Sequence, residues 1–253
     1  MNVYEREMMR GLIIAALCCP TLAMAQSGNE VGVTVGLGVK SAPSYFGSDS
    51  NDLGPTGSFA LDQLDFNGLS LGSGEGGGFG IGGSLRYIGA RKASDHSELE
   101  GLRDIDAALE LGGGLRYAAP GFRAFANLRY GVGGHESLVG DLGADFIQQI
   151  TPQWELRAGP RALWGSEDYA QTYFGVSAAD SVTSDFAQYD AGSGLVSAGV
   201  AASLGYQVTP DWGIVGSLRY DELQGDAANS PIVQSKDQVT AGIVITRRVN
   251  FSF

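Results

Sequence analysis

The chain has 253 residues, with 39 glycines, 8 prolines and 2 cysteines, and its mean hydropathy is zero. Hydrophobic residues make up 43 %, too many for a disordered chain, whereas charged residues reach only 17 % against the ~25 % usual in soluble proteins. The formal net charge of −12 argues against a nucleic-acid-binding protein, because such a protein needs a basic surface.

Residues 1–25 have the features of a secretory signal peptide. Arg6 and Arg10 precede an apolar stretch from Gly11 to Leu22, and an A-x-A site ends at Ala25. The apolar stretch is too short for a membrane-spanning helix, which needs ~20 residues. We therefore expect a signal peptide over 1–25, cleaved after Ala25, and a cysteine-free domain over 26–253.

Alternation of apolar with small or polar residues dominates the chain after residue 25. No apolar run reaches 18 residues, so the sequence predicts no membrane-spanning helix there. The alternating segments run about 10–14 residues, and a tilted strand needs ~9–11 residues to cross a bilayer. The expected strands lie near 31–40, 55–61, 66–72, 79–89, 104–117, 121–132, 138–150, 153–165, 195–207, 211–221 and 238–253.

The tripeptide Leu-Arg-Tyr occurs four times, at residues 85–87, 115–117, 128–130 and 218–220. In a strand its Leu and Tyr share one face and its Arg lies on the other, which suits lipid outside and a polar lumen inside. The predicted lumen charges are Arg86, Arg123, Arg129, Arg157, Arg161, Arg219 and Glu155, and Glu110 and Asp106 share their face by parity. These charges either line a pore or pair to fill a narrow barrel, and we favour pairing.

Short turns alternate with long polar connections. Proline-containing turns fall at 118–121, 151–153 and 209–211, and longer polar segments at 41–54, 90–103, 165–194 and 222–237. Short turns on one side and long loops on the other are typical of outer-membrane barrels. The sequence therefore predicts an all-β fold, a closed antiparallel transmembrane β-barrel. Eleven strands are expected and 41–78 does not resolve, but a single-chain bacterial barrel has an even number of strands, so twelve are favoured and ten are the alternative. A soluble β-sandwich or β-solenoid has shorter strands and fits less well.

The last residues carry a separate signal. Val249, Phe251 and Phe253 alternate at the C-terminal end of the sequence. A terminal Phe in this pattern resembles the signal that the barrel-assembly machinery reads on outer-membrane proteins. We therefore expect that machinery to be a partner of the chain.

Three segments of the chain contain distinctive motifs: residues 42–49 read APSYFGSD, 169–177 read YAQTYFGVS and 223–233 read LQGDAANSPIV. They resemble, in that order, the "aPxYxGSd" motif, the "YxxxYFGV" stretch and the "LxGDAxxSPIV" segment of the MipA/OmpV family, the MltA-interacting outer-membrane proteins. The motif residues in these segments are Pro43, Tyr45, Gly47, Tyr173, Phe174, Gly175, Asp226, Ser230 and Pro231. Structural roles are the default for them: the glycines would permit turn geometries, and Asp226 would close a loop.

The resemblance implies a barrel in the cell outer membrane, in contact with outer-membrane lipid and lipopolysaccharide. Some family members act as a scaffold that links a lytic transglycosylase to a bifunctional murein synthase. Others are linked to adhesion, osmotic response or antibiotic uptake. The resemblance thus favours a non-enzymatic scaffold, and the lumen arginines keep a passive small-solute channel as the alternative.

The sequence offers little chemistry. His135, Glu136 and Ser137 invite a hydrolase interpretation, but neighbouring strand residues point to opposite faces, and no G-x-S-x-G motif is present. The glycine-rich run 72–78 lacks the Lys-Ser/Thr ending of a phosphate loop. The acids of the predicted loops, among them Asp49 and Asp180, do not have the spacing of a calcium loop. We therefore expect no catalytic residue, no cofactor and no metal site, and a protein that is not an enzyme.

Overall fold

The structure is a computed structural model that describes residues 30–66, 69–72 and 77–252, so the expected signal peptide and Phe253 lie outside the described residues. One antiparallel sheet contains all the strands, in the order β3-β2-β1-β11-β10-β9-β8-β7-β6-β5-β4. The strands are β1 (Glu30–Pro43), β2 (Asn51–Phe66), β3 (Leu69–Gly72), β4 (Gly78–Ile88), β5 (Ala108–Ala119), β6 (Phe122–Gly133), β7 (Leu138–Gln149), β8 (Trp154–Gly165), β9 (Gly194–Gln207), β10 (Trp212–Leu223) and β11 (Asp237–Ser252).

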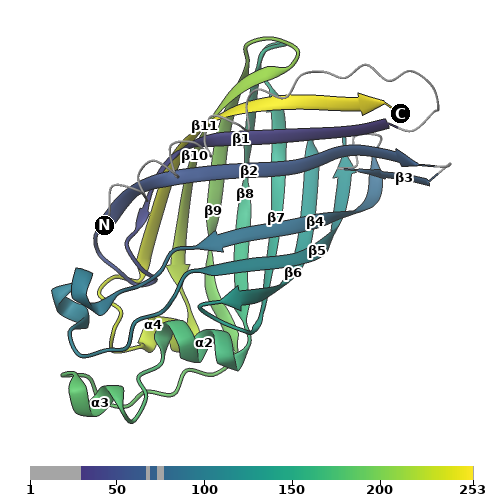
Figure 1. Cartoon of the computed structure of the whole chain (residues 1–253). Coiled ribbons are helices and arrows are strands. Elements are labelled where there is room, and N and C mark those ends of the chain that lie inside the picture. Colours follow the sequence, from purple (N-terminus) through teal and green to yellow (C-terminus); the bar gives the residue numbers. More distant parts are fainter. Residues whose placement is uncertain (1–29, 67–68, 73–76, 253) are drawn as a thin grey trace, which may run out of the picture.

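The sheet curls strongly into a half-barrel (Figure 1). Ten of its strands are long, from 11 to 16 residues, and β3 has only four. The all-β antiparallel prediction is confirmed, and the described residues contain ten long strands rather than the favoured twelve. No ladder between β4 and β2 or β3 closes the sheet within the described residues, although β4 touches both of them.

Both strands expected in the segment 41–78, near 55–61 and 66–72, have counterparts in the structure, but with other lengths. The first is the longer β2, continuous from Asn51 to Phe66 because it pairs with β1 along nearly its whole length. The second is the four-residue β3, Leu69–Gly72, which pairs with the end of β2. The polar start of β2 would be a loop on its own composition. Pairing of Asp52 with Ala42 and of Gly54 with Lys40 makes it a strand instead.

A second difference concerns the start of β5. The strand begins at Ala108 rather than near 104, since Ile105 forms an isolated bridge with Arg91 before the strand starts. Asp106 is therefore an exposed loop residue and not one of the inward charges, whereas Glu110 faces inward as parity predicted.

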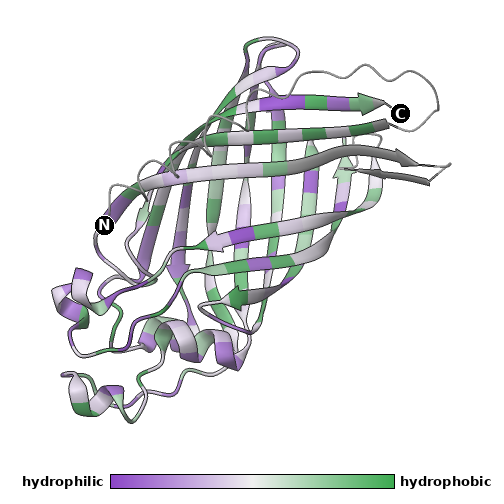
Figure 2. Cartoon of the chain, in the orientation of Figure 1, coloured by the Kyte–Doolittle hydropathy of each residue, from purple (hydrophilic) through white to green (hydrophobic). Residues whose placement is uncertain are grey.

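The apolar alternation is present on the strands, as Figure 2 shows along the sheet. In β4 the exposure of successive residues alternates throughout, with Leu85 and Tyr87 each 62 % exposed on either side of the inward Arg86. In β6, Leu128 and Tyr130 are likewise exposed and Arg129 is buried. The outer surface of the curled sheet is therefore apolar and the inner face carries the charges.

Helical segments gather at one end of the half-barrel, with the long connections 89–107, 166–193 and 224–236 (Figure 1). They comprise α2 (Glu167–Phe174), α3 (Asp180–Thr183) and α4 (Gly225–Asn229), with two single-turn 3-10 helices, Ala93–Asp95 and Ser97–Leu99. We call this the cap end and the opposite one the short-turn end. Among the described residues, none of the helices has the length and apolar character needed to cross a membrane.

Two hairpin turns at the short-turn end are copies of each other. Residues 149–154 and 207–212 both read Gln, a β-branched residue, Thr, Pro, a variable residue and Trp. In each copy the threonine hydroxyl accepts a hydrogen bond from the backbone N–H of the tryptophan at 3.1 Å. Trp154 stacks on Tyr206, and Trp212 lies under the guanidinium of Arg247, so both tryptophans have an aromatic or cationic neighbour at this end.

The outward apolar face predicts a specific sensitivity to charge. Substitution Leu128→Lys places a charge in the middle of an outward row, and we expect folding into lipid vesicles to lose about 2–4 kcal/mol. Urea titration in vesicles, read by heat-modifiable gel mobility, measures the change. The matched control is Ser203→Lys on the inner face of β9, where we expect a far smaller loss; equal losses in the two variants would contradict the assignment of the faces.

Candidate functional site

The cap is built on helix α2, whose one side is buried. Tyr169, Ala170, Tyr173 and Phe174 are at most 4 % exposed and share that side through their one-and-four spacing. They pack in one core with side chains of three strands, Val139 of β7, Leu163 of β8 and Val196 of β9. The amphipathic octapeptide is thus ordered by burial against the inner face of the sheet, which it covers at the cap end.

The three family-like segments, which are far apart in sequence, meet at this core. Phe46 of the first segment lies 5.1 Å from the ring of Tyr173 and 5.8 Å from that of Phe174, both in the second. The Ser230 hydroxyl of the third segment donates to the carbonyl of Phe174 at 2.5 Å. The fold therefore joins them into one structure that no single segment could form.

Tyr45 and Gly47 anchor the loop between β1 and β2. The Tyr45 hydroxyl donates to Glu98 at 3.3 Å, and burial together with that carboxylate raises the pKa of Tyr45. Gly47 has φ of 91°, and a Cβ there would lie 2.6 Å from Val233. Its carbonyl accepts the N–H groups of Gln234 and Ser235 at 2.7 and 2.9 Å, so this position requires glycine and a close approach.

The remaining motif residues take simpler roles. Asp226 accepts the Gly192 N–H at 2.8 Å and so closes α4 onto the preceding connection. Gly175 does not use a positive φ; its φ is −77°, and the side chain of Gln171 occupies the space a Cβ would need. Pro43 is the last residue of β1, and Pro231 is exposed beside Ser230.

Beneath the cap, the buried carboxylate of Glu110 collects the inward charges. Glu110 is 0 % exposed and accepts two hydrogen bonds from Arg86, at 2.7 and 2.6 Å, and one from Arg129 Nε at 2.8 Å. His135 Nε2 lies 3.2 Å from the same carboxylate. Three cationic or polar partners on three different segments thus converge on one oxygen pair.

This charge cluster is tied to both the sheet and the cap. Arg129 also bonds to Asp141 on β7 and donates to Ser84 on β4 at 2.9 Å. Arg86 donates to the hydroxyl of Tyr169 at 3.1 Å. The imidazole of His135 lies edge-on to Tyr169, with the ring centres 5.0 Å apart. Helix α2 therefore lies directly over the charged side chains around Glu110.

Tyrosines of α2 remain neutral at this site. Burial raises the pKa of Tyr169 and of Tyr173, so both phenols are protonated at neutral pH. The Tyr173 hydroxyl has no hydrogen-bond partner among the described residues. Arg91, also buried, donates to the Tyr173 carbonyl at 3.2 Å, and desolvation together with nearby Arg103 lowers its pKa.

Ser137, His135 and Glu110 form a chain of polar contacts that the sequence did not predict. His135 Nδ1 lies 2.8 Å from the Ser137 hydroxyl, so residues two apart do meet, and the acid is Glu110 instead of Glu136. All three are at most 3 % exposed. Glu110 is also engaged by two arginines, which leaves it poorly suited to support a catalytic imidazolium. The geometry satisfies buried polar groups and offers no solvent-exposed nucleophile.

The other predicted lumen charges mostly pair with nearby carboxylates, Arg157 and Arg161 toward the short-turn end and Arg219 toward the cap end. Arg161 Nη2 lies 2.6 Å from Asp145, Arg157 Nε lies 2.5 Å from Glu155, and Arg219 bonds to Asp221 two residues away. Arg123 is half-buried on the inner face and makes no hydrogen bond or ion pair with a described residue. The structure adds Arg116, which parity alone would have placed among them.

Residues of the expected assembly signal lie at the end of β11. Val249 pairs with Val33 and Phe251 with Val31 of β1, and Phe251 is 51 % exposed on the outer face. Phe253 lies outside the described residues. The part of the signal that is described thus has its apolar side chains on the outer surface.

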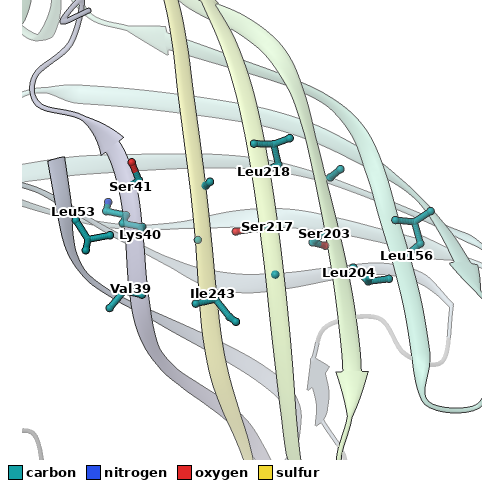
Figure 3. Close-up of a pocket in the computed structure, with 14 residues that line it drawn as sticks. Val39, Lys40, Ser41, Leu53, Leu156, Ser203, Leu204, Ser217, Leu218 and Ile243 are labelled. Atoms are coloured by element: carbon teal, nitrogen blue, oxygen red, sulfur yellow. The ribbon is translucent and has the colours of Figure 1, made fainter. Parts of the chain in front are cut away.

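That outer surface has a shallow groove of about 560 Å³ (Figure 3). The small residues Ala202, Gly216 and Ala241 line it together with larger side chains of the same outward rows. The bordering side chains are Val39, Leu53, Leu156, Leu204, Leu218 and Ile243. The groove is lined almost entirely by apolar atoms, which suits a hydrocarbon chain.

Comparison with known proteins gives one family. The family described as "MltA-interacting protein MipA" matches residues 35–249, most of the chain. No curated protein sequence matches it.

The solved structures that match the chain are distant from it in sequence. They include a bacterial polysaccharide outer membrane secretin (8 % identity, TM-score 0.42, 86 % of this chain and 98 % of that one). The outer membrane channel DcaP of Acinetobacter baumannii matches with 9 % identity and a TM-score of 0.37, over 90 % of this chain and 100 % of that one. A de novo designed transmembrane β-barrel matches with 11 % identity and a TM-score of 0.30, over 89 % of this chain and 100 % of that one.

Burial of the Glu110 carboxylate predicts that its removal lowers the free energy of unfolding much more than removal of a carboxylate from an exposed ion pair. Glu110→Gln leaves Arg86 and Arg129 without their shared charge, and we expect a loss of about 3–5 kcal/mol in the free energy of unfolding. The control, Glu155→Gln, breaks a pair whose side chains are 31–40 % exposed, and we expect less than about 1 kcal/mol. Denaturant titration in lipid vesicles compares them, and similar losses would contradict a central role for Glu110.

The glycine of the first segment predicts a local effect on the cap. Gly47→Ala strains a left-handed backbone at a cost of about 1–3 kcal/mol. We expect faster amide hydrogen exchange at Gln234 and Ser235, whose N–H groups bond to Gly47. Gly194→Ala is the control, because a Cβ there meets nothing within 4 Å. Unchanged exchange in the Gly47 variant would show that the loop does not hold the cap.

Proposed function

Because the chain belongs to the MipA family, we propose that it is a non-enzymatic interaction protein of the cell outer membrane, a scaffold for murein enzymes. A lytic transglycosylase is the first partner, as the family's description implies, and a murein synthase is the second. The chain reaches the membrane after a signal peptide over 1–25 is removed, and the short-turn end then faces the periplasm. Lipid and lipopolysaccharide surround the apolar outer face, and the groove of Figure 3 takes an acyl chain.

The observation that carries the proposal is the filled cap end. Helix α2 lies over the Glu110 cluster, and the side chains of both are buried. A solute crossing the barrel would have to displace this core and separate Arg86 from Tyr169 and Glu110. This supports a protein that is held in the membrane for its contacts rather than for conduction.

Closure of the barrel is part of the same proposal. Within a bilayer each unpaired backbone group costs several kcal/mol, so the free edges of β2 and β4 are expected to pair. The edges are antiparallel, and at the cap end the loop before β2 is tied to the connection after β4 through Tyr45 and Glu98. Pairing would give a ten-stranded barrel. Identical gel mobility before and after heating would contradict it.

A passive channel remains the second candidate. It is favoured by Arg157 and Arg219, whose inward side chains are 40 % and 38 % exposed and could line a water-filled passage. The two functions differ in whether solutes pass through the cap end, so experiments on one preparation of the purified protein can distinguish them.

We expect the purified chain to retain its organism's lytic transglycosylase in a pull-down and to show no conductance steps in planar bilayers. Gly47→Ala, which loosens the cap, is expected to leave retention unchanged and to add brief conductance steps. Heat-unfolded chain is the control for retention. Failure of the folded chain to retain the transglycosylase would overturn the scaffold, and regular steps in the wild type would favour the channel.

A further inference from the structure

The inner face of β4 to β8 carries more positive than negative charge. Six arginines and four carboxylates project from these strands, and five of the possible pairs are formed. The paired groups are Arg86 and Arg129 with Glu110, Arg129 with Asp141, Arg161 with Asp145 and Arg157 with Glu155. Two arginines, Arg116 and Arg123, are left without a carboxylate among the described residues.

Arg116 is satisfied only by neutral acceptors. Its Nη1 donates to Asn127 Oδ1 at 2.6 Å and to the Leu115 carbonyl at 3.1 Å, and its guanidinium lies 5.6 Å from the centre of the Phe125 ring. These contacts orient the group without neutralising it. A half-buried guanidinium in this state favours a nearby anion.

Arg123 faces a carboxylate that is already occupied. It lies directly opposite Asp145 in the pairing of β6 with β7, but Asp145 bonds to Arg161 at 2.6 Å. Arg161 in turn lies 5.4 Å from the Phe125 ring, on which Arg116 also stacks. Asp145 therefore serves Arg161 and faces Arg123, while Asp141, the carboxylate near Arg116, already bonds to Arg129 and Asn127.

The two unmatched arginines are neighbours at the short-turn end. They flank the tight turn at 120–121, since Arg116 pairs with Phe125 and Arg123 with Ala118 across β5 and β6. In this diagonal arrangement on one face the two residues are about 7–8 Å apart, and their Cβ atoms are somewhat closer. The Arg116 guanidinium extends toward Asn127, on the side of Phe125 away from Arg123. Rotation of its long side chain toward Arg123 then lets the two groups bracket a single anionic group.

We propose that Arg116 and Arg123, with Phe125 beside them, bind a carboxylate or phosphate group of a ligand that enters the barrel from the short-turn end. The planar guanidinium forks match both groups in bidentate geometry, and the partly desolvated wall strengthens the attraction. Phe125 gives the ligand's adjoining carbon atoms an apolar contact. That this ligand comes from the periplasm rests on the proposed function; the binding itself does not.

The test uses the purified full domain in detergent micelles with inorganic phosphate as the probe, followed by isothermal titration calorimetry. We expect saturable binding to the wild type, weakened at least about tenfold by Arg116→Gln or Arg123→Gln, the loss of one charge-assisted bidentate contact. Arg103→Gln, which removes an equal charge from an exposed position at the cap end, is the matched control and should change the affinity by less than twofold.

A second probe separates two sources of the anionic group. Hexaglutamate competing with phosphate at the same arginines would assign the site to acidic peptide segments, and phosphate binding that hexaglutamate leaves unchanged would assign it to small anions. Both results support the site. Heat-modifiable mobility reports folding of each variant, and Arg123→Lys, which keeps the charge but loses the fork, replaces Arg123→Gln should that variant not fold.

Two results would overturn the proposal. One is the absence of phosphate binding to the folded wild type. The other is equal phosphate affinity in the wild type and in a folded variant at Arg116 or Arg123. Neither measurement involves the transglycosylase, so loss of the proposed scaffold function would leave this inference standing, and the reverse also holds.

Discussion

A carboxylate with no exposure to solvent organises the interior of this protein. Burying a charge is unfavourable unless opposite charges and hydrogen bonds compensate for it, and Glu110 has two arginines and a histidine around it. Because these partners come from β4, β6 and the connection after β6, the carboxylate fixes three neighbouring segments at once. The cap depends on the same group, since Arg86 links Glu110 to Tyr169 of α2.

The segments of the cap end connect the Glu110 cluster to strands on both sides of the sheet. Helix α2 packs on β7, β8 and β9, while the loop after β1 reaches the connection after β4 through Tyr45 and Glu98. The cap-end edges of β2 and β4 are therefore held near each other by segments outside the sheet. In the proposed outer-membrane barrel, backbone pairing along β2 and β4 would complete the closure, and the bilayer would supply the driving force for that pairing.

The sequence pattern predicted those features of the fold that depend only on residues adjacent in the chain. Exposure alternates along Leu85, Arg86 and Tyr87 because successive side chains of a pleated strand point to opposite faces. The alternation of residue types in the sequence therefore predicts this arrangement. The length of β2 could not be read in this way, since its polar first residues are strand only by pairing with β1. The contact of His135 with Glu110 joins positions 25 apart, and no periodicity encodes it. The three family-like segments could be recognised as sequence motifs, but their convergence on Phe174 appears only in the folded chain.

The overall charge of −12 conceals a separation of charge along the barrel. The connection 166–193 carries five acidic residues and no basic ones, and 89–107 carries five acidic residues against three basic ones. The cap end is thus acidic, whereas the inner wall toward the short-turn end holds the unmatched Arg116 and Arg123. An anion is repelled from one end and attracted at the other, and this field acts over roughly the ~8 Å Debye length of physiological salt, and further where the wall excludes water. The same distribution that repels anions at the cap end therefore favours the opposite end as the side from which the proposed anionic ligand binds.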